Sequence, residues 1–255
     1  MTLELIGEPW FWAVAIPAIV VAGISKGGLG GGAGSAATPL IALVIPPAQA
    51  AAVLLPVLCV MDLAGMRAYL GRWERRIMRI IIPAGLAGCA LGTLSFRELN
   101  DHWIRVLLGA IALGFLAYSF APRRAPRAPP ADRQGWLWGS ISGFTSFVAH
   151  ASGPPLMVYL LPQKLDKVAF VATSVVFFGA INYAKIVPYW WLGLLELRNL
   201  STSLVLIPVG IAGTYLGVWL QSRITPRWFY RVVYALLALA GAKLLYDGAT
   251  GLLRA

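Results

Sequence analysis

Residues 25–39 read Ser-Lys-Gly-Gly-Leu-Gly-Gly-Gly-Ala-Gly-Ser-Ala-Ala-Thr-Pro and interrupt an apolar region where a continuous helix would otherwise be expected. This segment holds six glycines and a lone lysine. A glycine inside a helix costs about 1 kcal/mol relative to alanine, so this density predicts a broken helix. At the depth of a lipid bilayer, open backbone is tolerated only where protein or a water-filled cavity receives it. We therefore expect the segment to form half of a binding site within a membrane.

The composition supports the membrane assignment. Of the 255 residues, 59% are apolar and 12% are charged, and the mean hydropathy is +0.75. A soluble domain carries about 25% charged residues. The formal charge of +11 comes mostly from arginines in short loops between apolar runs, which favours cytoplasmic loops over a surface that binds nucleic acid. We expect an all-α protein that crosses the bilayer several times and binds no nucleic acid.

Several chemical classes are not expected from the sequence. Cys59 and Cys89 stand singly in apolar runs, which predicts buried thiols and no metal site. No Walker-type Gly-Lys-Ser/Thr motif is present, so ATP-driven transport is not expected. His150 and Ser152 lie two residues apart without a following acid or a nucleophile elbow, which argues against a hydrolytic enzyme. We predict no enzymatic activity, no catalytic residue and no cofactor.

The second half of the chain repeats the pattern of the first. The spacing from Pro39 to Pro46 recurs from Pro155 to Pro162. A proline followed by three glycines also recurs at identical spacing, as Pro83, Gly85, Gly88 and Gly92 and again as Pro208, Gly210, Gly213 and Gly217. Such a pattern indicates an internal duplication, a common construction in transporters. We predict a first transmembrane repeat over residues 1–121, a basic cytoplasmic linker over 122–134 and a second transmembrane repeat over 135–255.

Each repeat is expected to contain four apolar segments, and one of these is broken into a hairpin of half-helices around a Gly- or Pro-rich turn. Arginine-rich loops face the cytoplasm, which places residues 71–79 and the linker inside. The charge-balanced turns near residues 97–102 and 196–198 then lie outside. These positions favour inverted repeats, with each hairpin entering and leaving on one side. If the short runs cross completely, the repeats are instead parallel.

The glycine segment, the Pro39-Leu40 pair and the Ala-Ser-Gly-Pro-Pro at residues 151–155 resemble the TauE/SafE-type sulfite exporter family. The Asn182 and Lys185 pair is similar too. The resemblance covers nearly the whole chain. It implies a multi-pass permease of the bacterial inner membrane for sulfite, sulfonates or related organosulfur anions. Members differ in substrate and direction, so the resemblance fixes neither.

The two turns have the chemistry of an anion site. Helices that start near Ser35 and Pro155 would aim their N-termini at a common point, and helix N-termini attract anions. Half-helices that meet near the midplane are a recurrent transporter site. The alternative is that the glycines serve only close helix packing. We predict that the substrate-binding residues are Lys26, Gly27, Gly28, Gly30, Gly31, Gly32, Ser35, Ser152, Gly153, Pro154, Asn182 and Lys185.

The charged candidates each have a structural alternative. Lys26 would supply a positive charge to the anion, and Lys185 would do so together with Asn182, which lies one helical turn earlier. Either lysine could instead extend its ammonium group to the membrane interface. Asp62, the only carboxylate well inside its apolar run, and His150 are candidates for proton coupling. A lone histidine is also often structural.

The sequence thus predicts a secondary transporter in which proton- or potential-coupled alternating access carries an anion bound near the midplane. Its expected partners are a small anionic substrate and the lipid bilayer. Two alternatives remain open, a passive anion channel and a permease for another small carboxylate or oxyanion.

Overall fold

The computed structural model describes residues 5–28, 32–96, 98–121, 130–220 and 226–254. Within these ranges the regular structure is entirely helical. The first half contains α1 (Pro9–Gly28), η1 (Gly32–Ala36), α2 (Ala37–Ile41), α3 (Pro47–Ala68), α4 (Arg75–Phe96) and α5 (Asp101–Phe120). The second half contains α6 (Asp132–Ala149), α7 (Gly153–Leu160), η2 (Leu161–Gln163), α8 (Lys167–Trp191), α9 (Leu197–Leu220) and α10 (Pro226–Arg254).

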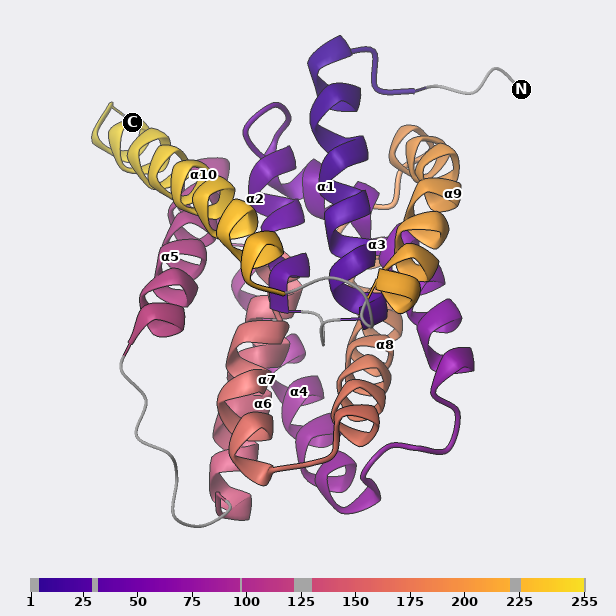
Figure 1. The fold of residues 1–255 in the computed structure, drawn as a ribbon. Helices are drawn as coiled ribbons and strands as arrows, with labels where there is room; N and C mark the ends of the chain where they lie inside the picture. The colour runs from indigo at the N-terminus through magenta and orange to yellow at the C-terminus, as the bar shows by residue number, and fades with distance from the viewer. Residues whose placement is uncertain (1–4, 29–31, 97, 122–129, 221–225, 255) are drawn as a thin grey trace.

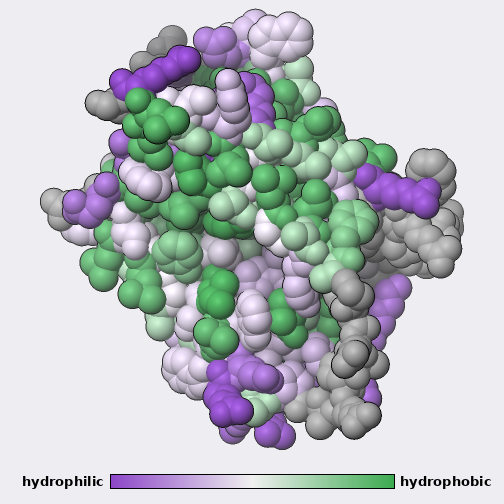
Figure 2. Space-filling view, turned by 90° about the vertical axis from the view of Figure 1, so that its left-hand side faces the viewer, coloured by the Kyte–Doolittle hydropathy of each residue, from purple (hydrophilic) through white to green (hydrophobic). Residues whose placement is uncertain are grey.

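Seven of the described helices are long and apolar enough to cross a membrane. They are α1, α3, α4, α5, α8, α9 and residues 231–254 of α10. At about 1.5 Å per residue, helices of this length match the hydrocarbon core of a bilayer. On the face shown in Figure 2, hydrophobic side chains cover most of the middle, and hydrophilic ones lie at the upper and lower ends and at the left and right edges. The prediction of an all-α protein with several membrane spans is confirmed.

Helices α1 and α2 form one hairpin and α6 and α7 form another, and the two hairpins approach each other from opposite ends of the molecule (Figure 1). The α1–α2 hairpin starts and ends at the upper end of the view, and the α6–α7 hairpin starts and ends at the lower end. Their turns meet in between, where η1 contacts α7. Helix α6 begins at Asp132, inside the segment that the sequence predicts as linker. The division into two repeats and their inverted orientation stay predictions.

The two halves of the chain share one helical assembly. Helix α1 packs along α9, α4 packs along α6, and α5 packs along α10, so each main pairing joins the first half to the second. The repeated proline–glycine motif lies at these crossings. A Cβ atom on Gly88 of α4 would lie 1.9 Å from the carbonyl oxygen of Ser140 in α6. The motif therefore allows the backbones of two helices to touch, as small residues do in membrane proteins.

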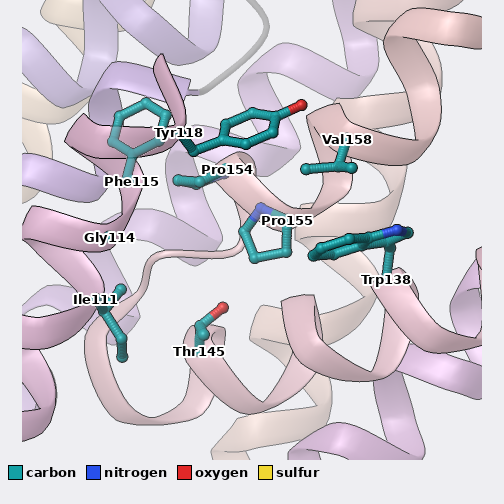
Figure 3. A pocket seen from close by; sticks show the side chains of 9 residues that line it. All are labelled: Ile111, Gly114, Phe115, Tyr118, Trp138, Thr145, Pro154, Pro155 and Val158. Atoms are coloured by element: carbon teal, nitrogen blue, oxygen red, sulfur yellow. The ribbon is translucent and has the colours of Figure 1, made fainter. Parts of the chain in front are cut away.

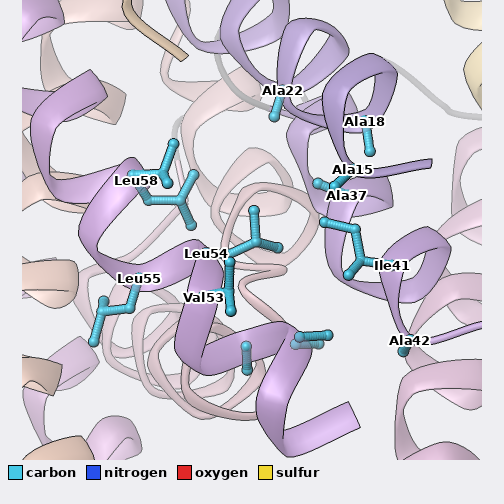
Figure 4. Packing of buried hydrophobic residues seen from close by; sticks show 14 of the residues in the cluster. Ala15, Ala18, Ala22, Ala37, Ile41, Ala42, Val53, Leu54, Leu55 and Leu58 are labelled. Carbon is cyan, nitrogen blue, oxygen red and sulfur yellow. The ribbon is translucent and has the colours of Figure 1, made fainter. Parts of the chain in front are cut away.

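Figure 4 shows the part of a large apolar cluster that lies between α1, α2 and α3. Alanines of α1, such as Ala15 and Ala22, face the larger side chains Leu54 and Leu58 of α3 and Ile41 of α2. Pairing small with large residues lets the helices interdigitate without voids. This packing holds the first hairpin against α3, the helix that supplies Asp62 to the centre.

Candidate functional site

Hydroxyl groups hold the two hairpin turns in shape. At the first turn, the Ser25 hydroxyl accepts a hydrogen bond from the backbone N–H of Gly34 at 3.1 Å. The hydroxyl of Tyr69 donates to the carbonyl of Gly27 at 3.1 Å. These bonds join the end of α1 to η1 and to the end of α3. Backbone groups freed by a broken helix inside a membrane need such partners.

The second turn is held in the same manner by α6. The Ser142 hydroxyl donates to the carbonyl of Ser152 at 2.6 Å, and the Thr145 hydroxyl donates to the carbonyl of Ala151 at 2.9 Å. His150 caps α6 in the left-handed region, with φ 51°. A non-glycine residue with positive φ is uncommon and strained, and such residues gather at functional sites. The turn therefore presents the His150 side chain in a conformation that the surrounding contacts impose.

A first charged cluster joins three helices. The ammonium group of Lys26 at the end of α1 forms an ion pair with Asp62 of α3 through Oδ1. The amide nitrogen of Asn182 in α8 donates to Oδ2 of Asp62 at 2.6 Å. All three residues are buried, with Asp62 only 1% exposed. Both oxygens of the carboxylate are thus bonded, which is the condition under which a buried charge is tolerated.

A second cluster surrounds Lys185 of α8. Its ammonium nitrogen lies 2.9 Å from the carbonyl oxygen and 3.1 Å from the hydroxyl of Ser146, and 2.7 Å from Nδ1 of His150. Nε2 of His150 lies 2.9 Å from the carbonyl oxygen of Ala51 in α3. An ammonium group only donates and a carbonyl only accepts. His150 therefore accepts at Nδ1 and donates from Nε2, which is the pattern of a neutral imidazole.

The structure brings most of the predicted charged residues together, but in two groups. Asn182 and Lys185 share α8 one turn apart, yet Asn182 bonds Asp62 whereas Lys185 bonds His150. Neither lysine extends to the end of the molecule, because both ammonium groups are buried and bonded to internal partners.

The remaining predicted residues are distributed around the turns. Ser35 in η1 and Ser152 before α7 are buried, and Gly153 begins α7. Gly27 and Gly28 are buried at the end of α1, and a Cβ on Gly27 would lie 2.1 Å from the carbonyl oxygen of Thr214 in α9. Gly27 is therefore also a packing residue. Gly32 opens η1, whereas Gly30 and Gly31 lie outside the described residues.

Several residues of the site were not predicted from the sequence. Ser146 accepts two hydrogen bonds from Lys185, and the Tyr189 hydroxyl donates to the carbonyl of Phe147 at 2.7 Å. The ring of Tyr189 lies 6.1 Å from that of His150. Tyr189 is fully buried, whereas its neighbours Trp190 and Trp191 are exposed. Only its spacing one turn after Lys185 could have indicated its position.

One buried hydroxyl has no hydrogen-bond partner within the described ranges. Thr38 lies in α2, directly after the first turn, and its residue exposure is 0%. Its Oγ1 lacks a partner among those residues. Buried hydroxyls are nearly always bonded to protein, water or ligand. Thr38 is therefore a polar group that a guest or a water molecule could satisfy near the turn.

An apolar groove of about 270 Å³ borders the second turn (Figure 3). One wall is α5, and the other is formed by α6 and the start of α7. The lining residues are Ile111, Gly114, Phe115, Tyr118, Trp138, Thr145, Pro154, Pro155 and Val158. The α5–α10 pair instead packs on the first hairpin, where Phe115 and Val233 join Ala36 in one apolar cluster. The α5–α10 pair therefore packs against the α1–α2 hairpin and is separated by a groove from the α6–α7 hairpin.

The fold and the site define a helical, multi-pass membrane protein with two buried charged clusters where two hairpins meet. Residues 15–244 match the sulfite exporter TauE/SafE family, so the chain belongs to that family. The match extends over most of the chain and confirms the resemblance drawn from the glycine and Ala-Ser-Gly-Pro-Pro motifs. Members of this family are membrane transporters and not enzymes.

A curated relative is the probable sulfite/organosulfonate exporter TauE of Cupriavidus necator. It is 26% identical over 147 residues, which cover 56% of this chain and 56% of the relative. The match thus spans little more than half the length of that protein. No solved structure matches the chain.

Proposed function

We propose that this protein is a secondary transporter of sulfite or a small organosulfur or sulfonate anion, located in a bacterial inner membrane. Membership of the TauE/SafE family supports the anion class, as does the description of the C. necator relative as a probable sulfite/organosulfonate exporter. The observation that carries the proposal is the pair of buried ammonium groups, Lys26 and Lys185, where the two hairpins meet. Ionisable residues inside a membrane are rare and usually mark a transport pathway.

The membrane topology that we propose consists of two inverted repeats. The hairpins enter from opposite ends of the molecule in Figure 1. The start of α4, with Arg75, Arg76 and Arg79, lies at the same end as the start of α6, with Arg133. Because arginine-rich segments stay on the cytoplasmic side, this end would face the cytoplasm.

In the proposed site, the anion lies between the two turns and is contacted by Lys26. Among the described residues, Asp62 is the one hydrogen-bond partner of the Lys26 ammonium group, whereas Lys185 has three acceptors around it. The Lys26 ammonium group therefore has N–H donors left for the anion, whereas Lys185 attracts the anion through its charge. Pro154 and Pro155 have no N–H, so at the start of α7 they can offer a guest only apolar contact.

Proton coupling would follow from competition for Lys26. When a bound anion draws the Lys26 ammonium group away from Asp62, the carboxylate keeps only its hydrogen bond from the amide of Asn182. Asp62 is then a buried carboxylate without its counter-charge. Such a group is stabilised by taking up a proton. His150 is less suited to this role in the observed arrangement, because its Nδ1 lone pair already accepts from Lys185. We therefore assign the coupling proton to Asp62.

Alternating access would use the α5–α10 pair. This pair packs on the first hairpin and stands apart from the second by the groove of Figure 3. In a protein with inverted repeats, the opposite state exchanges the environments of the two halves. We propose that α5 closes on α7 in that state and that the groove disappears.

The experiment is transport of radiolabelled sulfite into proteoliposomes that contain the purified protein. A carrier gives saturable uptake and counterflow, whereas flux that rises linearly without saturation would assign the protein to the channel class. The Lys26→Ala variant should lose sulfite binding when it is assayed below its own unfolding temperature, which the loss of the ion pair with Asp62 lowers. Lys243→Ala is the matched control, because Lys243 of α10 is exposed and pairs only with Asp247 among the described residues. Wild-type sulfite affinity in Lys26→Ala would contradict the assignment.

A further inference from the structure

We infer that the hydroxyl of Thr38 donates a hydrogen bond to the bound anion and is a second recognition group beside the Lys26 ammonium. The inference rests on the proposed function, because it assigns a further residue to the same anion site. The observation behind it is a buried hydroxyl that the fold leaves without a hydrogen-bond partner in the described part of the chain.

The Thr38 hydroxyl differs from other helical hydroxyls of this protein. Those of Thr93 and Thr202 donate to the carbonyl oxygen four residues earlier in their own helices, at 2.9 Å and 2.8 Å. Thr38 is 0% exposed, and its Oγ1 has no partner within the described ranges. A buried hydroxyl without a hydrogen bond is costly, and native proteins rarely keep one. A partner that is absent from the described chain is therefore expected at this position.

The break in the first hairpin explains why this hydroxyl is unpaired. Thr38 is the second residue of α2, so the residue four positions earlier, Gly34, lies in the 3-10 turn η1 and not in the same α-helix. An α-helix aligns the carbonyl at i−4 with a side-chain hydroxyl only after its first turn. The glycine-rich break that opens the backbone therefore also leaves a donor free.

Thr38 lies close to the part of α1 that carries Lys26. The hydroxyl of Ser25, which precedes Lys26 in the chain, accepts from the backbone N–H of Gly34 at 3.1 Å. Thr38 follows Gly34 by four residues, or about one helical turn. The ammonium group and the hydroxyl thus belong to the two helices of one hairpin, near its turn, where η1 contacts α7.

The position of Thr38 on α2 places the hydroxyl in the interior. Ala36 and Leu40 pack in the apolar cluster that this segment shares with α5 and α10. At about 100° per residue, Thr38 lies about 160° around the helix from both of them. It therefore faces away from the α5–α10 pair. Helix α2 also contacts α1 and α3, which carry the buried ion pair of the site.

A sulfur oxyanion can satisfy both donors. Sulfite and sulfonates carry three oxygens on one sulfur atom, and each oxygen accepts hydrogen bonds. A threonine hydroxyl supplies one O–H donor, and an ammonium group supplies three N–H donors. The hydroxyl is uncharged, so its bond to the anion does not require Asp62 to be either ionised or protonated. A hydrogen bond to a charged acceptor is worth about 10–100-fold in affinity.

Replacement of the hydroxyl by a methyl group tests the inference. Thr38→Val keeps the shape of the side chain and removes the donor. Sulfite binding to the purified protein is measured by the rise of its unfolding temperature with sulfite concentration. We expect the affinity to fall about 10–100-fold. Without sulfite, the variant should unfold at a temperature no lower than that of the wild type, because it loses no hydrogen bond within the described chain.

Two further variants are controls. Thr38→Ser keeps the donor and should bind sulfite within about threefold of the wild type. Thr214→Val makes the same change at a threonine of α9 that is 1% exposed and whose hydroxyl donates to the carbonyl of Gly210 at 2.9 Å. This variant should keep the wild-type sulfite affinity and unfold at a slightly lower temperature, because it loses that bond.

The outcomes separate this inference from the proposed function. Wild-type sulfite affinity in Thr38→Val overturns the inference, and so does an equal loss in Thr38→Ser, which would assign the effect to packing. A Thr38→Val protein that is less stable than the wild type, or that cannot be purified, also overturns it, because the hydroxyl would then be bonded within the protein. In these cases sulfite counterflow by the wild type still supports the proposed function. Absence of sulfite binding and counterflow in the wild type removes both.

Discussion

The Lys26→Met substitution would break a buried ion pair, and its effect on stability can be derived from the structure. The side chains of Lys26 and Asp62 are 10% and 1% exposed, so the substitution leaves a carboxylate inside the protein with Asn182 as its only described hydrogen-bond partner. Removing one partner of a buried pair costs about 3–5 kcal/mol. At about 2–4 °C per kcal/mol for a chain of this size, the unfolding temperature should fall by about 6–20 °C.

The assay is thermal unfolding of the detergent-purified variants, followed by circular dichroism at one fixed heating rate because membrane proteins often unfold irreversibly. Lys243→Met is the matched control. Lys243 pairs with Asp247 on α10 at 2.8 Å, but the two side chains are 58% and 31% exposed. An exposed pair of this kind contributes at most about 1 kcal/mol, so the control should lose little stability.

The double variant Lys26→Met/Asp62→Asn tests the reasoning further. It removes both charges and keeps an amide that can bond Asn182, so most of the lost stability should return. The coupling between the two sites is then large and positive. If Lys26→Met is no less stable than Lys243→Met, or if the double variant is as unstable as the two single changes added together, the two residues are not a buried pair.

Two further predictions concern glycines. Gly88→Ala should destabilise the protein by about 1–3 kcal/mol through overpacking, because its Cβ would lie 1.9 Å from the carbonyl oxygen of Ser140. Gly114→Ala is the control. No atom lies within 4 Å of its new methyl group, so this variant should have wild-type stability in the same unfolding assay. Comparable losses in both variants would contradict the close α4–α6 approach. Gly114→Trp fills the groove between α5 and α7 and should slow sulfite counterflow about tenfold, or about 1.4 kcal/mol on the barrier, with unchanged thermal stability. Leu239→Trp on the exposed side of α10 should transport normally, and equal rates in the two Trp variants would rule out a moving groove.

The sequence by itself determined the membrane class, the positions of the long helices and the break at residues 25–39. These follow from local properties, because hydropathy over about 20 residues predicts a span and clustered glycines predict open backbone. Lys26, Asp62, His150 and Lys185 also stood out without a structure, since an ionisable side chain within an apolar run is unusual wherever the helix lies. Their choice required no knowledge of their partners.

Only the tertiary structure decided which of these residues meet. Asp62 bonds Lys26 across 36 residues of chain and Asn182 across 120 residues, and no local pattern encodes those separations. The tertiary contacts also showed that the repeated proline–glycine motif lies where helices pack closely, whereas its spacing in the sequence indicated only an internal duplication. The physical reason is that the residues on one face of a helix follow from the local sequence, whereas the helix that packs against this face depends on how distant segments of the chain cross.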